Sequence, residues 1–219
     1  MSSINITQIR SLDHAVELMY HPLASEIPTK RLSLEAIRDL FTYLPQSKAN
    51  PEDAEVRTKL FLACYASLFP FLYTGGVGLS HSIGHAIGAT YSIPHGITSC
   101  LSLSPTVHFK ASNPEEAKQI ARIIPYIGKT STGSDEKDSH VVADAIADLV
   151  EQLGHKTTLT AVCHPAPYVS ILLSISSTMS RQAMPRKRRS RAAHCTARNI
   201  RTLRTVSSEI FKCMIDHTN

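Results

Sequence analysis

Three histidines between residues 81 and 95 have spacings that suit a chemical site. His81 and His85 are four residues apart, so on a helix they share one face. Pro94 ends that helix, and we expect Gly96 to let the chain turn so that His95 returns beside the other two. Imidazole is a good ligand for zinc and iron. The spacing therefore predicts a divalent-metal site, although ordinary solvated or hydrogen-bonded histidines remain the alternative.

Two segments resemble signatures of a known family. The run from Gly78 to Gly96, with His81, His85 and His95 at these offsets, resembles the signature of the iron-containing alcohol dehydrogenases, whose relatives include maleylacetate reductases and glycerol dehydrogenases. The segment Ile9 to Glu17 resembles the Asp-x-x-x-His-Ala-x-Glu helix that opens the C-terminal domain of these enzymes. The resemblance implies a mainly α fold, the helical C-terminal domain of the dehydroquinate synthase-like, iron-type alcohol dehydrogenase fold.

The resemblance also implies roles for single residues. It implies that His14, His81 and His95 are metal ligands, together with the residue at position 10. It places His85 near the nicotinamide and the substrate, where an imidazole can transfer or orient a proton. We therefore expect His85 to be a catalytic residue.

Position 10 departs from the family pattern, because Arg10 stands where the family has an aspartate ligand. A guanidinium has no lone pair to offer a metal. At about 5 Å from a divalent cation, with an effective dielectric near 20, it would add a repulsion of about 7 kcal/mol. Either Arg10 points away or the metal is absent. In the metal-free case Arg10 would hold a substrate carboxylate or polarise a ketone, as a second catalytic residue. Asp13 is a weaker replacement ligand, because it lies about 100° around the helix from His14.

The family implies an oxidoreductase that uses NAD(P), with Fe(2+) or Zn(2+) as the possible metal, and an alcohol, ketone or keto acid substrate resembling maleylacetate. Family members carry a nucleotide-binding domain before the first helix, and only about eight residues precede it here, so we expect a truncated chain. The run Gly75-Gly76-Val77-Gly78 does not replace a phosphate-binding loop. The alternative is a catalytically inactive helical pseudoenzyme or a partner-binding fragment.

Residues 1–160 read as one helical domain. Ser33 predicts a cap for a helix over Leu34 to Tyr43, and Asp53 stands before a long apolar helix that Pro70 interrupts. Asn113 and Pro114 predict another helix start, and Gly154 closes a last helix that begins near Ser139.

Residues 161–219 differ in composition from the rest. They carry ten Lys or Arg against two acidic residues, a net charge of +8, which leaves −3 for residues 1–160. We expect an irregular, divergent tail that includes the basic run Arg186 to Arg191. Nucleic-acid binding through this run is the alternative to simple disorder, and we rank it lower.

The five cysteines are odd in number and form no Cys-x-x-Cys pair, which favours a reducing compartment, the cytoplasm, over a disulfide scaffold. The apolar runs Leu60 to Tyr73 and Tyr168 to Ser176 are too short to span a bilayer. We therefore expect no membrane association, and the resemblance leaves a homo-oligomer open.

Overall fold

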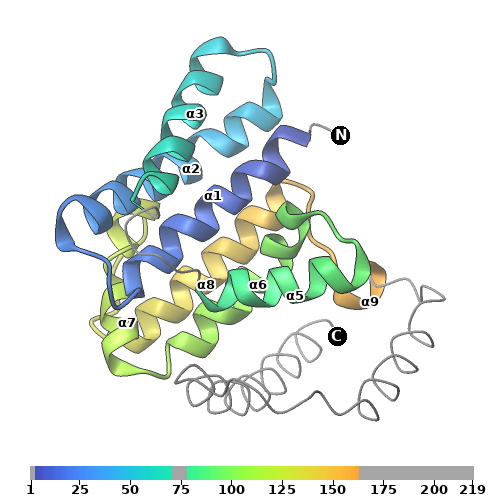
Figure 1. Cartoon of the computed structure of the whole chain (residues 1–219). Coiled ribbons are helices and arrows are strands. Elements are labelled where there is room, and N and C mark those ends of the chain that lie inside the picture. Colours follow the sequence, from blue (N-terminus) through green and yellow to red (C-terminus); the bar gives the residue numbers. More distant parts are fainter. Residues whose placement is uncertain (1–2, 71–77, 163–219) are drawn as a thin grey trace, which may run out of the picture. The chain divides into compact units, whose positions relative to one another are not determined.

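The computed structural model describes residues 3–70 and 78–162, and these consist of helices and their connections, without a strand. Two short helical segments cover Glu26–Lys30 and Ile124–Ile127. The longer elements in Figure 1 are α1 (Ser3–Tyr20), α2 (Arg31–Ala49), α3 (Ala54–Leu68), α5 (Leu79–Tyr91), α6 (His95–Lys110), α7 (Pro114–Ala121), α8 (Asp135–Gln152) and α9 (Leu159–Val162). The prediction of a mainly α fold is confirmed.

Contacts divide the chain into residues 1–158 and residues 159–219. The domain boundary that we predict after residue 160 remains a prediction. The basic run Arg186 to Arg191 and the glycines at 75 and 76 lie outside the described residues. Among the helices that are described, none has the length and apolar character that crossing a membrane requires.

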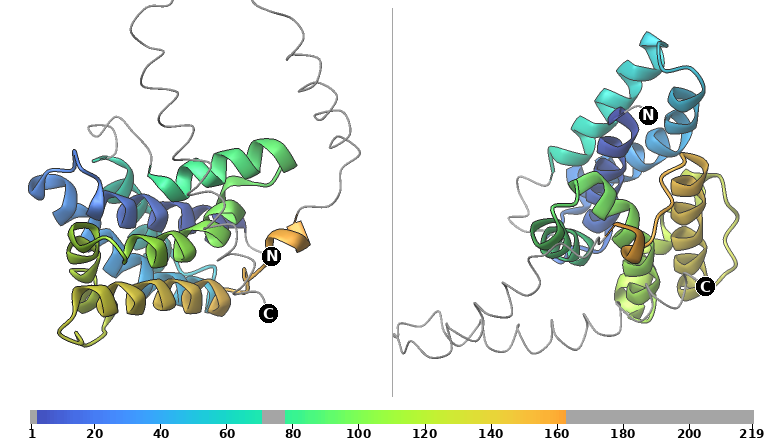
Figure 2. Two further views of the ribbon diagram at one scale, coloured as in Figure 1. Left: turned by 90° about the horizontal axis from the view of Figure 1, so that it is seen from below. Right: turned by 90° about the vertical axis from the view of Figure 1, so that its right-hand side faces the viewer.

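Helix α1 is the centre of the first unit, because it contacts α2, α3, α5, α6 and α7. Its apolar side chains are fully buried at Ile9, Leu12, Val16 and Met19. Helix α6 packs against both α1 and α8, and Figure 2 shows it between them. Burial of the apolar side of α1 is the main force that holds this helix in place. Functional groups on α1 are therefore presented from a fixed backbone.

Helix starts follow the predicted caps in two cases. The Asp53 carboxylate accepts hydrogen bonds from the N–H groups of Glu55 and Val56, both at 3.0 Å, and α3 begins at the next residue. Asn113 accepts hydrogen bonds in the same way at the start of α7, where Pro114 is the first helical residue. The predicted cap at Ser33 is wrong. Helix α2 begins earlier, at Arg31, because the chain is already helical at Lys30, and Ser33 is buried inside α2.

The connection between α5 and α6 differs from the prediction. Helix α5 ends at Tyr91, before Pro94, and Ser92 reverses the chain in a left-handed conformation with φ of 56°. Pro94 precedes the first residue of α6 and does not end α5. Gly96 lies within α6, where a Cβ would collide with the backbone carbonyl of Ile6. The role of Gly96 is therefore to allow close approach of α6 to α1, and not to make the turn.

Candidate active site

Four histidine rings converge from three helices. Helix α1 contributes His14, α5 contributes His81 and His85, and α6 contributes His95. The ring centroids of His14 and His81 are 4.6 Å apart, and that of His95 is 5.2 Å from His81. His85 lies 4.9 Å from His95 between centroids, and their Nε2 atoms are 3.1 Å apart. The structure thus brings together the four histidines that the sequence singles out.

Small residues between α5 and α6 allow this convergence. Gly84 faces α6, where a Cβ would lie 2.9 Å from the Thr98 hydroxyl and 3.9 Å from the His95 ring. The Thr98 hydroxyl donates a hydrogen bond to the carbonyl of His95 at 2.7 Å. The two helices therefore approach closely enough for His85 and His95 to touch.

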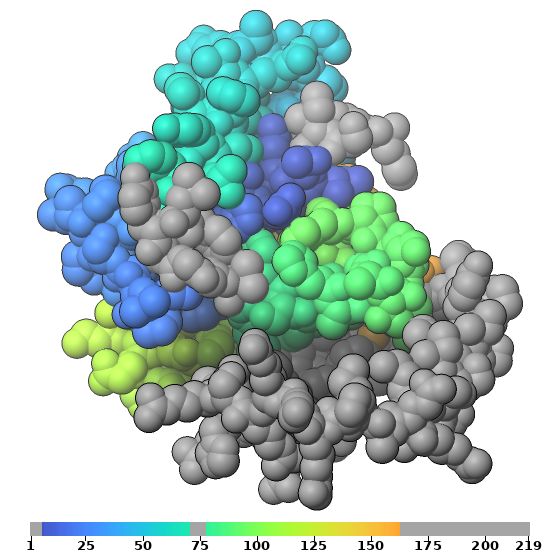
Figure 3. Space-filling model, in the orientation of Figure 1, coloured from blue at the N-terminus to red at the C-terminus, as the bar shows by residue number. Residues whose placement is uncertain are grey.

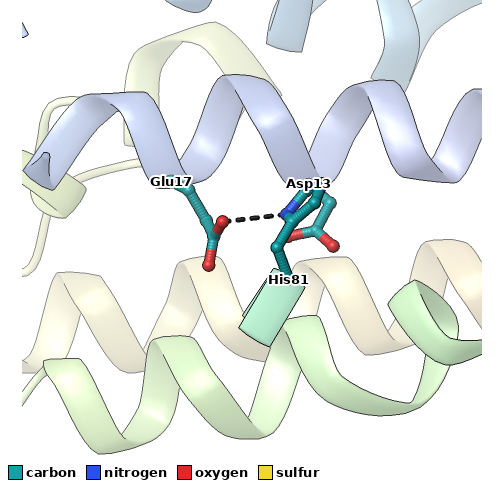
Figure 4. Close-up of side chains that lie close together, drawn as sticks. All are labelled: Asp13, Glu17 and His81. Atoms are coloured by element: carbon teal, nitrogen blue, oxygen red, sulfur yellow. Dashed lines mark hydrogen bonds and ion pairs between the residues drawn. The ribbon is translucent and has the colours of Figure 1, made fainter. Parts of the chain in front are cut away.

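Two buried carboxylates lie behind His81 (Figure 4). Asp13 and Glu17 are one turn apart on α1 and both point toward α5. The Nδ1 atom of His81 is 2.9 Å from Oε2 of Glu17 and 3.4 Å from Oδ1 of Asp13. Among the described residues, Asp13, Glu17 and His81 form a set of three possible metal ligands whose donor atoms all lie within 4.8 Å of one another.

The first turn of α5 binds the same carboxylates. Glu17 accepts hydrogen bonds from the N–H of Gly78 at 2.9 Å and from the N–H of Ser80 at 2.6 Å. The Ser80 hydroxyl donates to Oδ2 of Asp13 at 3.1 Å. A Cβ at Gly78 would collide with the Glu17 carboxylate, so the contact requires glycine. Main-chain N–H groups at a helix start favour negative charge, which helps these two acids to be buried side by side.

The ionisation of the histidines follows their surroundings. Burial lowers the pKa of His81, but hydrogen bonds and charge from Asp13 and Glu17 outweigh it and raise the pKa to about 9. Burial, with the positive charge of His81, lowers the pKa of His14 to about 3. Burial also lowers the pKa of His95, and the charge of Arg10 adds to this effect. At neutral pH His14 and His95 are therefore neutral imidazoles, the form that binds metals.

Arg10 is exposed and lines a cavity of about 320 Å³ together with His14. The other walls come from α1 and from an apolar face of α3. They consist of Thr7, Ser11, Phe61, Cys64, Tyr65 and Leu68. Figure 3 shows α3 beside the first half of α1 on this face. The charge of Arg10 is near enough to His14 and His95 to lower the pKa of both.

From the sequence, Asp13 is expected only as a weaker replacement ligand, and Glu17 has no expected role. The angle of about 100° separates Asp13 from His14 within α1, but α5 packs against the side of α1 that carries both acids. A usable signal was present, because Asp13 and Glu17 are four residues apart in a helix whose other positions are largely apolar. Two acids on a buried helix face need partners, and His81 with Ser80 supplies them.

The imidazole nitrogens of His14, His81 and His95 are candidate ligands for a transition metal. Three imidazoles with one position left open are the ligand pattern of many catalytic zinc sites. Because Nδ1 of His81 faces carboxylates, Nε2 is the nitrogen that would bind a metal, and a carboxylate behind a ligating histidine is a common supporting contact. The imidazoles of His14, His81 and His95 are donors of the type that a transition metal prefers, and Arg10 supplies no fourth donor. The donor atoms that lie within 4.8 Å of one another among the described residues, however, belong to Asp13, Glu17 and His81.

Comparison with known proteins identifies the class. Residues 5–165 match the model of the C-terminal part of the Fe-containing alcohol dehydrogenase family. The chain therefore belongs to this family, and the described helices correspond to its helical domain. This confirms the resemblance that the two sequence segments indicate.

Individual relatives agree with this assignment. The chain is similar to 1-propanol dehydrogenase PduQ of Salmonella typhimurium, with 32% identity over 117 residues, which is 53% of this chain and 31% of the relative. It is 31% identical over 127 residues to the NAD-dependent methanol dehydrogenase of Bacillus methanolicus, covering 58% of this chain and 32% of the relative. The chain thus spans about a third of the length of these curated relatives.

A solved structure shows the same fold. The alcohol dehydrogenase from Oenococcus oeni superposes with a TM-score of 0.66 at 23% identity, covering 84% of this chain and 48% of the other. At this level of identity the likeness concerns the fold alone.

Proposed function

We propose that this chain supplies the helical, substrate-facing part of an NAD(P)-dependent alcohol or carbonyl oxidoreductase. The observation that carries the proposal is the convergence of His14, His81, His85 and His95 in a member of the iron-containing alcohol dehydrogenase family. Relatives named 1-propanol dehydrogenase, NAD-dependent methanol dehydrogenase and maleylacetate reductase support a small alcohol, aldehyde or keto acid as the substrate class.

In this proposal His14, His81 and His95 hold Fe(2+) or Zn(2+). Bound there, such an ion would supply Lewis-acid chemistry to the substrate oxygen, and the nicotinamide coenzyme would give or accept the hydride. Glu17 fixes the orientation of His81 through the bond at Nδ1. In a cluster without the ion, Arg10 would instead attract the carboxylate of a keto acid at the cavity beside His14.

His85 moves the proton in this proposal. It is exposed, and its Nε2 is within hydrogen-bond distance of Nε2 of His95, so one of the two nitrogens donates and the other accepts. An exposed imidazole beside the bound substrate can pass a proton between the substrate oxygen and water.

Turnover tests the catalytic part of the proposal. In an enzyme that joins this chain to a nucleotide-binding domain, we expect oxidation of NADH or NADPH by propanal or maleylacetate, followed by absorbance at 340 nm with Fe(2+) or Zn(2+) added. The His85→Ala variant should be slower by about 100-fold, in line with loss of a general acid or base. Ser82→Ala, an exposed change on the same helix, is the matched control and should be unaffected. Wild-type turnover no faster than that of His85→Ala would refute the proposed role.

Metal content tests the ligand assignment separately. Wild-type protein loaded with Zn(2+) and dialysed should retain an equivalent that the double variant His81→Ala, His95→Ala lacks. Equal content in both proteins would exclude these histidines as ligands.

A further inference from the structure

A second pair of histidines lies between α6 and α8. The Nδ1 atoms of His108 and His140 are 2.8 Å apart, and the ring centroids are separated by 5.0 Å. Asp144 follows His140 by one turn on α8, and its Oδ1 lies 3.1 Å from Nε2 of His108. We propose that His108 and His140 together bind a divalent transition metal, with Asp144 positioning His108. This site is independent of the proposed oxidoreductase function.

The hydrogen bonds define which nitrogen of His108 would bind the metal. An ionised carboxylate can only accept, so Nε2–H of His108 donates to Asp144. With the proton on Nε2, the lone pair of Nδ1 points at Nδ1 of His140. A carboxylate that orients a ligating histidine through its other nitrogen is the supporting arrangement found around protein-bound zinc.

Metal binding requires the proton between the two Nδ1 atoms to move to another nitrogen. Without metal, Nδ1–H of His140 donates to Nδ1 of His108. When a metal binds, this proton moves to Nε2 of His140, and both Nδ1 lone pairs face the ion. Solvent water carries this proton from one nitrogen to the other, so the rings gain and lose no proton overall.

The distance between the nitrogens suits one shared ion. Two imidazole nitrogens bound to one zinc at about 2.0–2.1 Å are separated by about 2.9–3.4 Å for angles between right and tetrahedral. The observed 2.8 Å therefore needs to open by up to about half an ångström, and each ring must also turn so that its Nδ1 lone pair points at the ion and not at the other nitrogen. The backbones on both sides are held by buried apolar residues, Leu103 and Val107 on α6 and Val142 and Ile146 on α8. Such a rigid frame favours binding, because little order is lost.

The surroundings allow an ion to enter from solvent. The side chain of His108 is 18% exposed and that of Asp144 is 69% exposed, so water can fill the remaining coordination positions. Two imidazole donors select zinc, nickel or copper over magnesium or calcium, which prefer oxygen ligands.

Zinc titration of the full chain tests the site. We expect wild-type protein to bind an equivalent of Zn(2+) that His140→Ala lacks, measured by equilibrium dialysis with circular dichroism to check folding. His21 belongs to neither histidine cluster, so His21→Ala should still bind this Zn(2+) ion. Unchanged zinc stoichiometry and affinity in folded His140→Ala would overturn the proposal.

Asp144→Asn gives a second test that does not depend on His140→Ala folding, because residue 144 is exposed. It keeps a hydrogen-bond acceptor but loses the charge, and we expect about tenfold weaker zinc binding at this site. Unchanged affinity would remove Asp144 from the proposal. The double variant His81→Ala, His95→Ala should retain the Zn(2+) bound at His108 and His140. The zinc content of the two variants therefore distinguishes a failure of this site from a failure of the proposed active site. If the double variant loses this bound Zn(2+) while His140→Ala retains it, the ion belongs to the cluster that contains His81 and His95, and the proposal is wrong.

Discussion

The Nδ1 atom of His81 lies 2.9 Å from Oε2 of Glu17, and both side chains are only 1% exposed. This contact joins the helix that carries two of the four clustered histidines to the central helix α1. Together with Asp13, it places negative charge behind a buried imidazole. The pair is therefore both a structural link between α1 and α5 and the means of orienting His81.

Replacing Glu17 by glutamine should weaken this link. The raised pKa of His81, about 9, contributes stability that is fully present below pH 6.5 and is lost as pH rises through 9. In chelator-treated Glu17→Gln we expect a lower His81 pKa by NMR, an unfolding free energy lower by about 1–3 kcal/mol at pH 6, and a flatter dependence between pH 6 and 9. Glu55→Gln, an exposed acid on α3, is the control. If the unfolding free energy of wild type and of Glu17→Gln changes equally between pH 6 and 9, the charge interaction between Glu17 and His81 does not contribute.

Changing Arg10 should alter metal affinity at the histidine cluster. Arg10→Asp removes a positive charge beside His14 and restores a carboxylate, so zinc affinity should rise tenfold or more, as measured by competition with a chelator. Arg10→Ala removes the charge alone and should give a smaller gain. If both variants bind zinc as wild type does, Arg10 has no influence on the site.

Gly96→Ala should destabilise the contact between α1 and α6. The added methyl would collide with the main chain of Ile6, which cannot move without shifting α1. We expect a loss of about 1–3 kcal/mol in urea unfolding. Gly84→Ala is the comparison, because its methyl meets the Thr98 hydroxyl, a side chain that can rotate. A loss in Gly96→Ala no larger than in Gly84→Ala would contradict the close approach.

Asp138 should make the fold sensitive to acid. Burial raises the pKa of its carboxyl, but hydrogen bonds from the Ser131 hydroxyl and from the N–H and hydroxyl of Thr132 outweigh this and lower it. The stabilisation is present above about pH 4 and is lost as pH falls through the lowered pKa. Asp138→Asn should cost about 2 kcal/mol at pH 7 and flatten the acid limb of the stability curve. Asp135→Asn, which is exposed, should leave both unchanged.

The sequence predicts the helical class, because helix periodicity and residues at helix starts such as Asp53 are local signals. The spacing predicts that His81, His85 and His95 meet, and the family resemblance adds His14 to them. The prediction fails where a long-range contact decides. The four-residue spacing places Asp13 and Glu17 on one face of α1, but it does not reveal that α5 packs against that face and supplies His81 as the partner. Gly96 similarly serves a contact with Ile6, ninety positions away in the chain, and not the local turn.

Helix α5 begins at a glycine that has no side chain to cap it, and Glu17 of α1 binds the N–H groups of Gly78 and Ser80 in its place. In a peptide of residues 78–91 alone, this end of the helix would lack its acceptor and would fray. The helix bearing His81 and His85 is completed only when α1 has docked. Assembly of the histidine cluster and formation of the tertiary fold are therefore one event in the order of folding.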